Sequence, residues 1–224
     1  MPTVVIPTYN ESESLPKLIN GLRGVLPDVS ILVVDDGSPD GTAKIAREMG
    51  AVVLERESKA GLASAYVLGF KEALDRGAEL IIQMDADLSH NPKDVPRLIA
   101  KTSDLVIGSR YVAGGGTINW PIHRKAMSRF GSAWARGWLG LPLADLTGGF
   151  KCWTSKALSH VLAEPIRSEG YAFQVEMTWR AIHGGFSVEE VPIVFTERID
   201  GVSKMSKGIA LEAAWLIPAL RFRS

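Results

Sequence analysis

Short apolar runs alternate with longer segments of helical periodicity through the first half of the chain. Five runs have the length and β-branched content of buried strands: TVVIP (3–7), SILVV (30–34), VVLE (52–55), LIIQM (80–84) and DLVIG (104–108). Between them, apolar residues recur at helical spacing in residues 12–24, 42–49, 62–76 and 92–102. This alternation predicts an α/β fold in which helices cover both faces of a mostly parallel sheet.

End signals support several of these helices. Asn91 before Pro92 predicts an N-cap followed by proline at the first helical position, and Gly50 and Gly77 stand where a helix-ending glycine is expected. The second half is less regular, with a further helix expected around 171–183. Because neither an internal repeat nor a low-complexity linker interrupts the pattern, we expect one domain over residues 1–224.

Polar residues follow four of the predicted strands directly. They are Thr8-Tyr9-Asn10-Glu11, Asp35-Asp36-Gly37-Ser38, Asp85-Ala86-Asp87 and Ser109-Arg110. In open sheets of this class, ligands bind beyond the carboxyl ends of the strands. The sequence therefore predicts a functional site at one edge of the sheet.

The segment QMDADLSH (83–90) carries two carboxylates at a strand end. In an extended chain Asp85 and Asp87 point to the same side, and as isolated residues they could be ordinary turn formers. Ser89 adds a third oxygen nearby, and paired Cys or His ligands are absent. Hard cations such as Mg²⁺ and Mn²⁺ prefer oxygen ligands and share them with substrate phosphates. We therefore expect Asp85, Asp87 and Ser89 to form a metal site for a diphosphate.

The loops after the first two strands are suited to a nucleotide. A G-x-G-x-x-G dinucleotide motif is absent, and acids stand at the strand end instead, so Asp36 is the candidate for accepting from a base or ribose. Tyr9 could stack on a nucleobase while Glu11 accepts a hydrogen bond. The alternative is that Asn10 or Ser12 merely caps the next helix.

A cationic loop follows the last strand-like run. RIDGVSKMSK (198–207) contains three cations, two serines and a glycine in ten residues. Arg binds phosphate oxygens in a bidentate manner and Lys acts as a point charge. This composition predicts a loop that closes over phosphates.

Composition excludes several classes of function. With 25 basic and 25 acidic residues, the chain has no overall field that would attract nucleic acid. The one cysteine, Cys152, favours a reducing, cytoplasmic location, and the N-terminus does not resemble a signal peptide. No run of 18 apolar residues occurs, so a transmembrane span is not expected. The four histidines show neither metal-ligand spacing nor a hydrolytic triad.

Two segments have the character of membrane-interface helices. As a helix, residues 120–139 place Met127, Phe130, Trp134 and Trp138 on one stripe. A helix packed on the core and an interfacial helix with tryptophans at headgroup depth are both consistent with this pattern. Residues 208–223 repeat it.

Taken together, these motifs resemble the polyprenyl-phosphate sugar synthases of glycosyltransferase family 2, and most closely the dolichyl-phosphate mannose synthases. The resemblance is carried by IPTYNE, VVDDGSPDGT, MDADLSH, IGSRY, DLTGGF and FTERIDGVSKM, in this order along the chain. It implies a GT-A fold of Rossmann-like character. It further implies inverting transfer of mannose from GDP-mannose to a polyprenyl phosphate with a divalent metal. The lipid acceptor implies peripheral attachment to the cytoplasmic face of a membrane. A membrane-anchoring subunit is a further candidate as a partner.

The resemblance also implies roles for individual residues. Nucleotide contacts fall to Pro7, Tyr9, Glu11, Val34 and Asp36, and the metal and donor motif to Asp85, Ala86 and Asp87, with Ser89 beside them. Arg198 and Lys204 would hold the donor diphosphate, and Arg110, Arg124 and Ser128 would receive the acceptor phosphate. Asp87, Arg110 and Arg198 are expected to act in catalysis itself.

Three other functions share parts of this pattern. A sister enzyme would make polyprenyl-phosphate glucose from UDP-glucose with the same machinery. A sugar-1-phosphate nucleotidyltransferase would resemble G-G-x-G-T-R after its first strand, where this chain has IPTYNE. A nucleotide-sugar-binding subunit without activity would not need both carboxylates and the complete set of cations.

Overall fold

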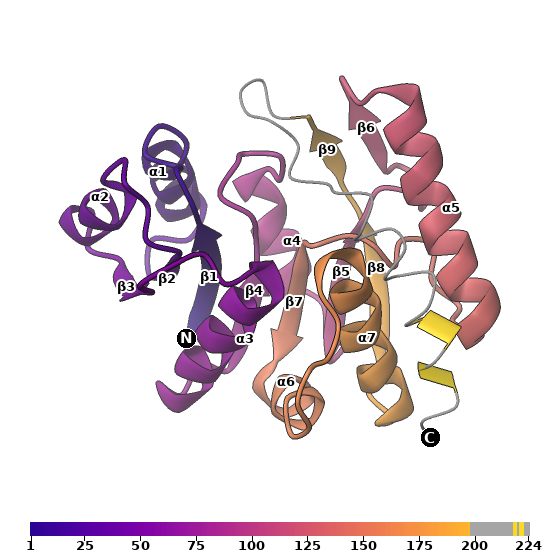
Figure 1. The fold of residues 1–224 in the computed structure, drawn as a ribbon. Coiled ribbons are helices and arrows are strands. Elements are labelled where there is room, and N and C mark those ends of the chain that lie inside the picture. The colour runs from indigo at the N-terminus through magenta and orange to yellow at the C-terminus, as the bar shows by residue number, and fades with distance from the viewer. Residues whose placement is uncertain (198–216, 219, 222–224) are drawn as a thin grey trace.

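A seven-stranded sheet forms the centre of the computed structural model, which describes residues 1–197, 217–218 and 220–221 (Figure 1). Its strand order is β3-β2-β1-β4-β7-β5-β8. The strands are β1 (Pro2–Thr8), β2 (Ser30–Asp35), β3 (Val52–Glu55), β4 (Leu80–Gln83), β5 (Leu105–Ser109), β7 (Lys151–Thr154) and β8 (Val188–Pro192). The first five confirm the predicted strands. β7 and β8 were not predicted, and β7 pairs antiparallel with both β4 and β5.

Helices cover both faces of this sheet, as predicted. They are α1 (Leu15–Val25), α2 (Thr42–Glu48), α3 (Leu62–Asp75), α4 (Val95–Ile99), α5 (Ile122–Leu139), α6 (Ser155–Val161) and α7 (Gly170–His183). Alternation along the strands explains the two layers. Val5 belongs to the core formed with α3, α6 and α7, whereas its neighbours Val4 and Ile6 belong to the core formed with α1 and α4.

Most predicted helix ends are confirmed, but one helix is shorter than expected. Asn91 accepts a hydrogen bond from the backbone N–H of Lys93, as an N-cap does. The expected helix at 92–102 is instead a 3₁₀ turn over Pro92–Asp94 followed by α4, which ends at Ile99. Pro96 lacks an N–H group, and inside one continuous helix its ring would clash with the carbonyl of residue 92. A break between two short elements avoids that clash.

The first helix also begins later than predicted. α1 starts at Leu15 after Ser14, so neither Asn10 nor Ser12 caps it. The backbone N–H of Ser12 instead donates to the carboxylate of Asp40, at 3.0 Å. The polar segment after β1 is therefore tied to the loop after β2.

The helix α5 lies at the far end of the sheet, beside a small parallel pair of strands, β6 (Gly116–Ile118) and β9 (Val194–Thr196) (Figure 1). Its bounds match the helix expected at 120–139. Trp134 and Trp138 pack partly buried against the core, whereas Ile122 and Phe130 are 86% and 69% exposed. Within the described residues, no helix combines the length and apolarity needed to cross a membrane.

The predicted helix at 208–223 lies mostly outside the described residues. The four residues described in it are helical, and Ile217 and Leu220 are buried in the core. Arg221 donates a hydrogen bond to the backbone carbonyl of Trp138, at 3.0 Å. This end of the chain therefore packs against the end of α5.

Candidate active site

The polar segments that follow β1, β2, β4 and β5 meet at one edge of the sheet. β1 runs parallel to β2 and β4, and β5 has the same direction because β4 and β5 both pair antiparallel with β7. The prediction of one common edge is thus confirmed. We call this edge the carboxyl rim; it consists of residues 8–11, 35–38, 85–89 and 109–110.

The two carboxylates of the DxD motif lie on the carboxyl rim and share a face. Met84 and Ala86 are buried in the core, whereas Asp85 and Asp87 are half-buried. Their oxygens are the ligand type that Mg²⁺ and Mn²⁺ prefer. Among the described residues, no group of three or more His, Cys, Asp or Glu side chains could hold a metal ion. The pair therefore suits a cation whose remaining ligands are substrate phosphates and water.

Different groups hold the two carboxylates in place. The hydroxyl of Tyr66 donates to Oδ1 of Asp85 at 2.6 Å, and the backbone N–H of Ser89 donates to Oδ1 of Asp87 at 3.1 Å. Leu88, which lies between Asp87 and Ser89, adopts a left-handed conformation, with φ of 61°. Burial, and then the charges of both carboxylates, raise the pKa of Tyr66 well above its ordinary value, so its hydroxyl remains a donor. Ser89 is itself buried, and a role as metal ligand stays a prediction.

At the end of β2, the neighbouring acids Asp35 and Asp36 are both buried but have different partners. The Thr8 hydroxyl and the Ser38 backbone N–H donate to Asp35 at 3.0 and 2.8 Å. Asp36 instead accepts from Nε of Arg56 at 2.5 Å. Asp35 thus joins the ends of β1 and β2, and Arg56, which the sequence did not single out, orients Asp36.

The remaining predicted nucleotide contacts differ in their exposure. Tyr9 is half-buried, and Nζ of Lys59 lies 4.6 Å from the centroid of its ring. Pro7 and Glu11 are half-buried on the same segment. Val34 is fully buried in the core, and its role as a nucleotide contact stays a prediction.

At the other end of the carboxyl rim, Arg110 forms a buried ion pair with Asp145. Its Nε and one Nη donate to the two carboxylate oxygens, both at 2.7 Å, and the same Nη donates to Thr147 at 2.9 Å. Burial alone would raise the pKa of Asp145, but the Arg110 guanidinium holds that pKa below its ordinary value. Ser128 lies 3.0 Å from the Thr147 hydroxyl, so two of the predicted phosphate-binding residues meet here.

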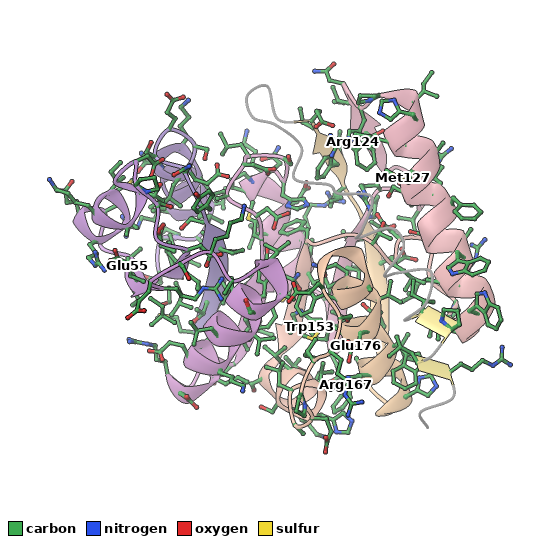
Figure 2. All side chains as sticks on the ribbon, viewed as in Figure 1. Glu55, Arg124, Met127, Trp153, Arg167 and Glu176 are labelled. Carbon is green, nitrogen blue, oxygen red and sulfur yellow. The ribbon has the colours of Figure 1, made fainter. Side chains whose placement is uncertain are left out.

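Arg124, on the first turn of α5 (Figure 2), is held by Glu197, the residue that follows β9. Two donors here are buried without a hydrogen-bond partner in the part of the chain that the structure describes, the Arg124 Nε and the Trp120 indole N–H, and the buried Tyr111 hydroxyl lies close to Ser128. The Arg110 guanidinium lies 5.2 Å from the ring centroids of both Tyr111 and Trp120. We call the group formed by Arg110, Tyr111, Trp120, Arg124 and Ser128 the acceptor cluster. Each buried donor without an acceptor costs about 1–3 kcal/mol, so the cluster is suited to an anion that has several acceptor oxygens.

A polar layer beneath the rim joins β4, β7 and α7. Nζ of the fully buried Lys151 donates to the backbone carbonyl of Gln174 at 2.8 Å and to the Thr178 hydroxyl at 3.0 Å. The Gln83 amide donates to the Gln174 side chain at 2.9 Å. Burial lowers the pKa of Lys151 to about 7. No local pattern indicates this layer, since Gln83, Lys151 and α7 are far apart in the chain.

The two cations predicted to hold the donor diphosphate, Arg198 and Lys204, lie outside the described residues. Their roles remain predictions. The described site therefore contains the carboxylate part and the acceptor cluster, but not the cationic loop.

Two named proteins are similar to this chain in sequence over most of its length. The chain is 45% identical over 223 residues to the polyprenol monophosphomannose synthase of Mycolicibacterium smegmatis, covering 96% of this chain and 84% of that protein. It is 47% identical over 216 residues to the undecaprenyl-phosphate mannosyltransferase of Micrococcus luteus, covering 93% of this chain and 89% of that protein.

Comparison with solved structures supports the fold. Glucosyl-3-phosphoglycerate synthase from Mycobacterium tuberculosis, in complex with Mn²⁺ and UDP-glucose, superposes with a TM-score of 0.70 at 19% identity, covering 100% of this chain and 78% of that one. This likeness confirms the predicted GT-A architecture. The pattern described as glycosyl transferase family 2 matches residues 3–161. With these relatives over most of its length, the chain belongs to glycosyltransferase family 2.

Proposed function

We propose that this chain is an inverting mannosyltransferase that moves mannose from GDP-mannose to a polyprenyl (dolichyl) phosphate, giving polyprenyl-phosphate mannose and GDP. The observation that carries the proposal is the acceptor cluster, where buried donors without partners lie around Arg110, on the same carboxyl rim as Asp85 and Asp87. The names of the two relatives support the sugar and the class of acceptor. GDP as the nucleotide rests on the resemblance of the sequence motifs.

A divalent cation, Mg²⁺ or Mn²⁺, fits the carboxylate pair. Asp85 and Asp87 supply only oxygen ligands, and the structural neighbour was solved with Mn²⁺ and a nucleotide sugar. When bound, such an ion neutralises charge on the departing diphosphate. Asp85 and Asp87 would hold it, and the structure leaves Ser89 as a candidate for a further contact.

The acceptor explains why the site needs no general base. A phosphate monoester is largely ionised near neutral pH, because its second pKa is about 6. Its oxygen can attack the sugar without losing a proton to the protein, so the residues need only bind and orient it. Arg124, Trp120 and Tyr111 offer donors to such a group, and Ser128 lies beside them. The inactive-subunit alternative gives these donors and both carboxylates no purpose.

The lipid tail of the acceptor explains the exposed face of α5. This helix exposes Ile122, Phe130 and Met127, the last of which is labelled in Figure 2, and its charged residues are Arg and Lys without any Asp or Glu. Amphipathic helices of this composition lie in the interface of anionic membranes. We therefore assign residues 1–224 to one catalytic domain that sits on the cytoplasmic face of a membrane through α5. A membrane contact of residues 208–223 rests on their sequence pattern alone, because Ile217 and Leu220, which the structure describes, are buried in the core. A membrane-anchoring subunit is a further candidate partner.

The nucleotide sugar is tested by competition between donors. We expect label from GDP-mannose, but not from UDP-glucose, to enter an organic-extractable lipid that mild acid cleaves, and only in the presence of Mg²⁺ or Mn²⁺. The two donors are supplied in turn with the same polyprenyl phosphate. Labelling from UDP-glucose alone would replace mannose by glucose in the proposal.

Replacing Arg124 by alanine should weaken acceptor binding selectively. Hydrogen bonds to charged groups contribute about 1.5–3 kcal/mol, so KM for the polyprenyl phosphate should rise roughly 10- to 100-fold. KM for GDP-mannose should change little. Arg136→Ala is the matched control, since Arg136 lies exposed on the same helix near its other end. If KM for the donor rises instead, Arg124 serves the donor side.

A further inference from the structure

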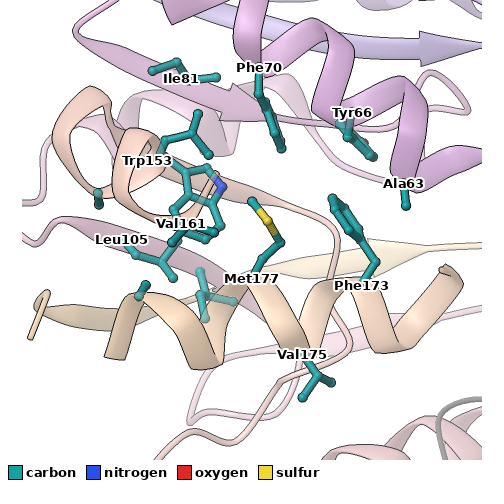
Figure 3. Packing of buried hydrophobic residues seen from close by; sticks show 14 of the residues in the cluster. Ala63, Tyr66, Phe70, Ile81, Leu105, Trp153, Val161, Phe173, Val175 and Met177 are labelled. Atoms are coloured by element: carbon teal, nitrogen blue, oxygen red, sulfur yellow. The ribbon is translucent and has the colours of Figure 1, made fainter. Parts of the chain in front are cut away.

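Tyr66 is a fully buried residue of α3 whose side-chain hydroxyl reaches the carboxyl rim. Its hydroxyl lies 2.6 Å from Oδ1 of Asp85, and its ring is 0% exposed. The ring stacks on Phe70 and on Phe173, with centroid distances of 5.5 and 6.1 Å (Figure 3). The hydroxyl is therefore presented to the rim from inside the core, by side chains of α3 and α7.

The backbone of α3 is itself fixed against the sheet. A Cβ atom on Gly69 would lie 2.4 Å from Cγ1 of Val5 and 2.9 Å from Cγ2 of Val34, so this turn of the helix rests directly on β1 and β2. Packing at this distance leaves α3 little freedom to shift. The position of the Tyr66 hydroxyl is thus set by the core.

The second oxygen of Asp85 also faces a close neighbour. A Cβ atom on Gly149 would lie 3.5 Å from Oδ2 of Asp85 and 3.5 Å from Nε2 of Gln174. Asp85 is enclosed by α3 on one side and by the segment before β7 on the other. Asp87 differs, because its hydrogen bond to Ser89 lies within its own loop.

We propose that Tyr66 is a positioning residue for the nucleotide-sugar site: its hydroxyl fixes the orientation in which the Asp85 carboxylate meets the cation and the donor diphosphate. The proposal rests on the proposed function, in which Asp85 is a cation ligand. Partners that hydrogen-bond to a ligating carboxylate orient it, and their loss costs 10- to 100-fold in metal affinity or activity. A hydroxyl that only satisfied the core would leave both quantities unchanged when removed.

The test compares the wild-type protein with Tyr66→Phe, which removes one oxygen and keeps the ring that fills the core. We expect the apparent affinity for Mn²⁺ in the presence of GDP, measured by titration calorimetry, to fall roughly 10- to 100-fold. The Mn²⁺ concentration needed for half-maximal turnover should rise in parallel, with the thermal transition still cooperative. Thr154→Val is the matched control. It removes a hydroxyl that caps α6, at the opposite end of the sheet, and should lower stability without changing Mn²⁺ affinity.

The outcomes separate this proposal from the function on which it rests. If wild-type protein binds GDP with no dependence on Mn²⁺, the cation role that the proposed function gives to Asp85 is wrong. If wild-type binding depends on Mn²⁺ and Tyr66→Phe matches it, the function stands and the positioning role of Tyr66 is overturned.

Discussion

Asp87→Asn should reduce metal-dependent turnover by about 1,000-fold while leaving the fold intact. A bound cation stabilises a developing diphosphate by several kcal/mol, and a loss of about 4 kcal/mol corresponds to roughly three orders of magnitude in rate. Asparagine keeps an oxygen that can accept from the Ser89 backbone N–H, so the loop retains its hydrogen bond. The measurement is initial rate against Mn²⁺ concentration, with a melting curve for each protein.

Asp28→Asn provides the matched control for this change. Asp28 is exposed in the turn before β2, at the end of that strand opposite the carboxyl rim, so its variant should retain wild-type rates. An Asp87→Asn protein with a native melting curve and turnover within about threefold of wild type would remove Asp87 from the cation site.

Of the single substitutions proposed for this protein, Asp145→Asn should cause the largest loss in the free energy of unfolding. Asp145 is 0% exposed, and its carboxylate accepts two hydrogen bonds from the buried Arg110 guanidinium and one from the Arg110 backbone N–H. Removing one partner of a buried ion pair leaves the other charge uncompensated and costs about 3–5 kcal/mol. The free energy of unfolding should fall by that amount, as measured by urea denaturation followed through tryptophan fluorescence.

Two further variants test whether the broken ion pair causes this loss of stability. Glu72→Gln breaks a largely exposed pair with Arg76 on α3 and should cost less than about 1 kcal/mol. The double variant Arg110→Met with Asp145→Leu replaces the buried pair by apolar side chains and should regain most of the stability. It should remain inactive, because Arg110 belongs to the acceptor cluster. A double variant no more stable than Asp145→Asn would contradict the ion-pair explanation.

The ion pair between Arg110 and Asp145 also makes the stability of the protein depend on pH. Since the native pKa of Asp145 lies below the ordinary value of about 3.9, the unfolded chain binds the proton more tightly than the folded one. The stabilisation is therefore complete above that ordinary value and is lost as pH falls through the native pKa. The Asp145→Asn protein should lack this acid limb.

Local pattern was enough to predict the first half of the fold and the carboxyl rim. The apolar runs that became β1, β2, β4 and β5 are largely buried, which is the condition under which a strand shows as a continuous apolar run, whereas the edge strand β3 is only partly buried. Asp85 and Asp87 followed from alternation at a strand end. Glycosyltransferase family 2 and the GT-A fold, both suggested by motifs, are confirmed.

Contacts between segments far apart in the chain could not be predicted from the local sequence pattern. Tyr66 reads as one apolar position of a helix, and nothing local indicates that its hydroxyl meets a carboxylate 19 residues away. Lys151 reads as a surface charge, yet it is fully buried because Gln174 and Thr178 on α7 satisfy it. β7 carries this lysine and is only four residues long, so neither its burial nor its direction was visible.

The place of β7 between β4 and β5 has a consequence for synthesis of the protein on the ribosome. β4 lacks its second neighbour until β7 has emerged, roughly 70 residues later. At translation rates of about 5–20 residues per second, its apolar edge waits roughly 4–14 s for a partner. An unpaired apolar edge is a template for aggregation. The nascent chain is therefore most in need of a chaperone between the emergence of these two strands, and slower translation of that stretch should lower the yield of folded enzyme.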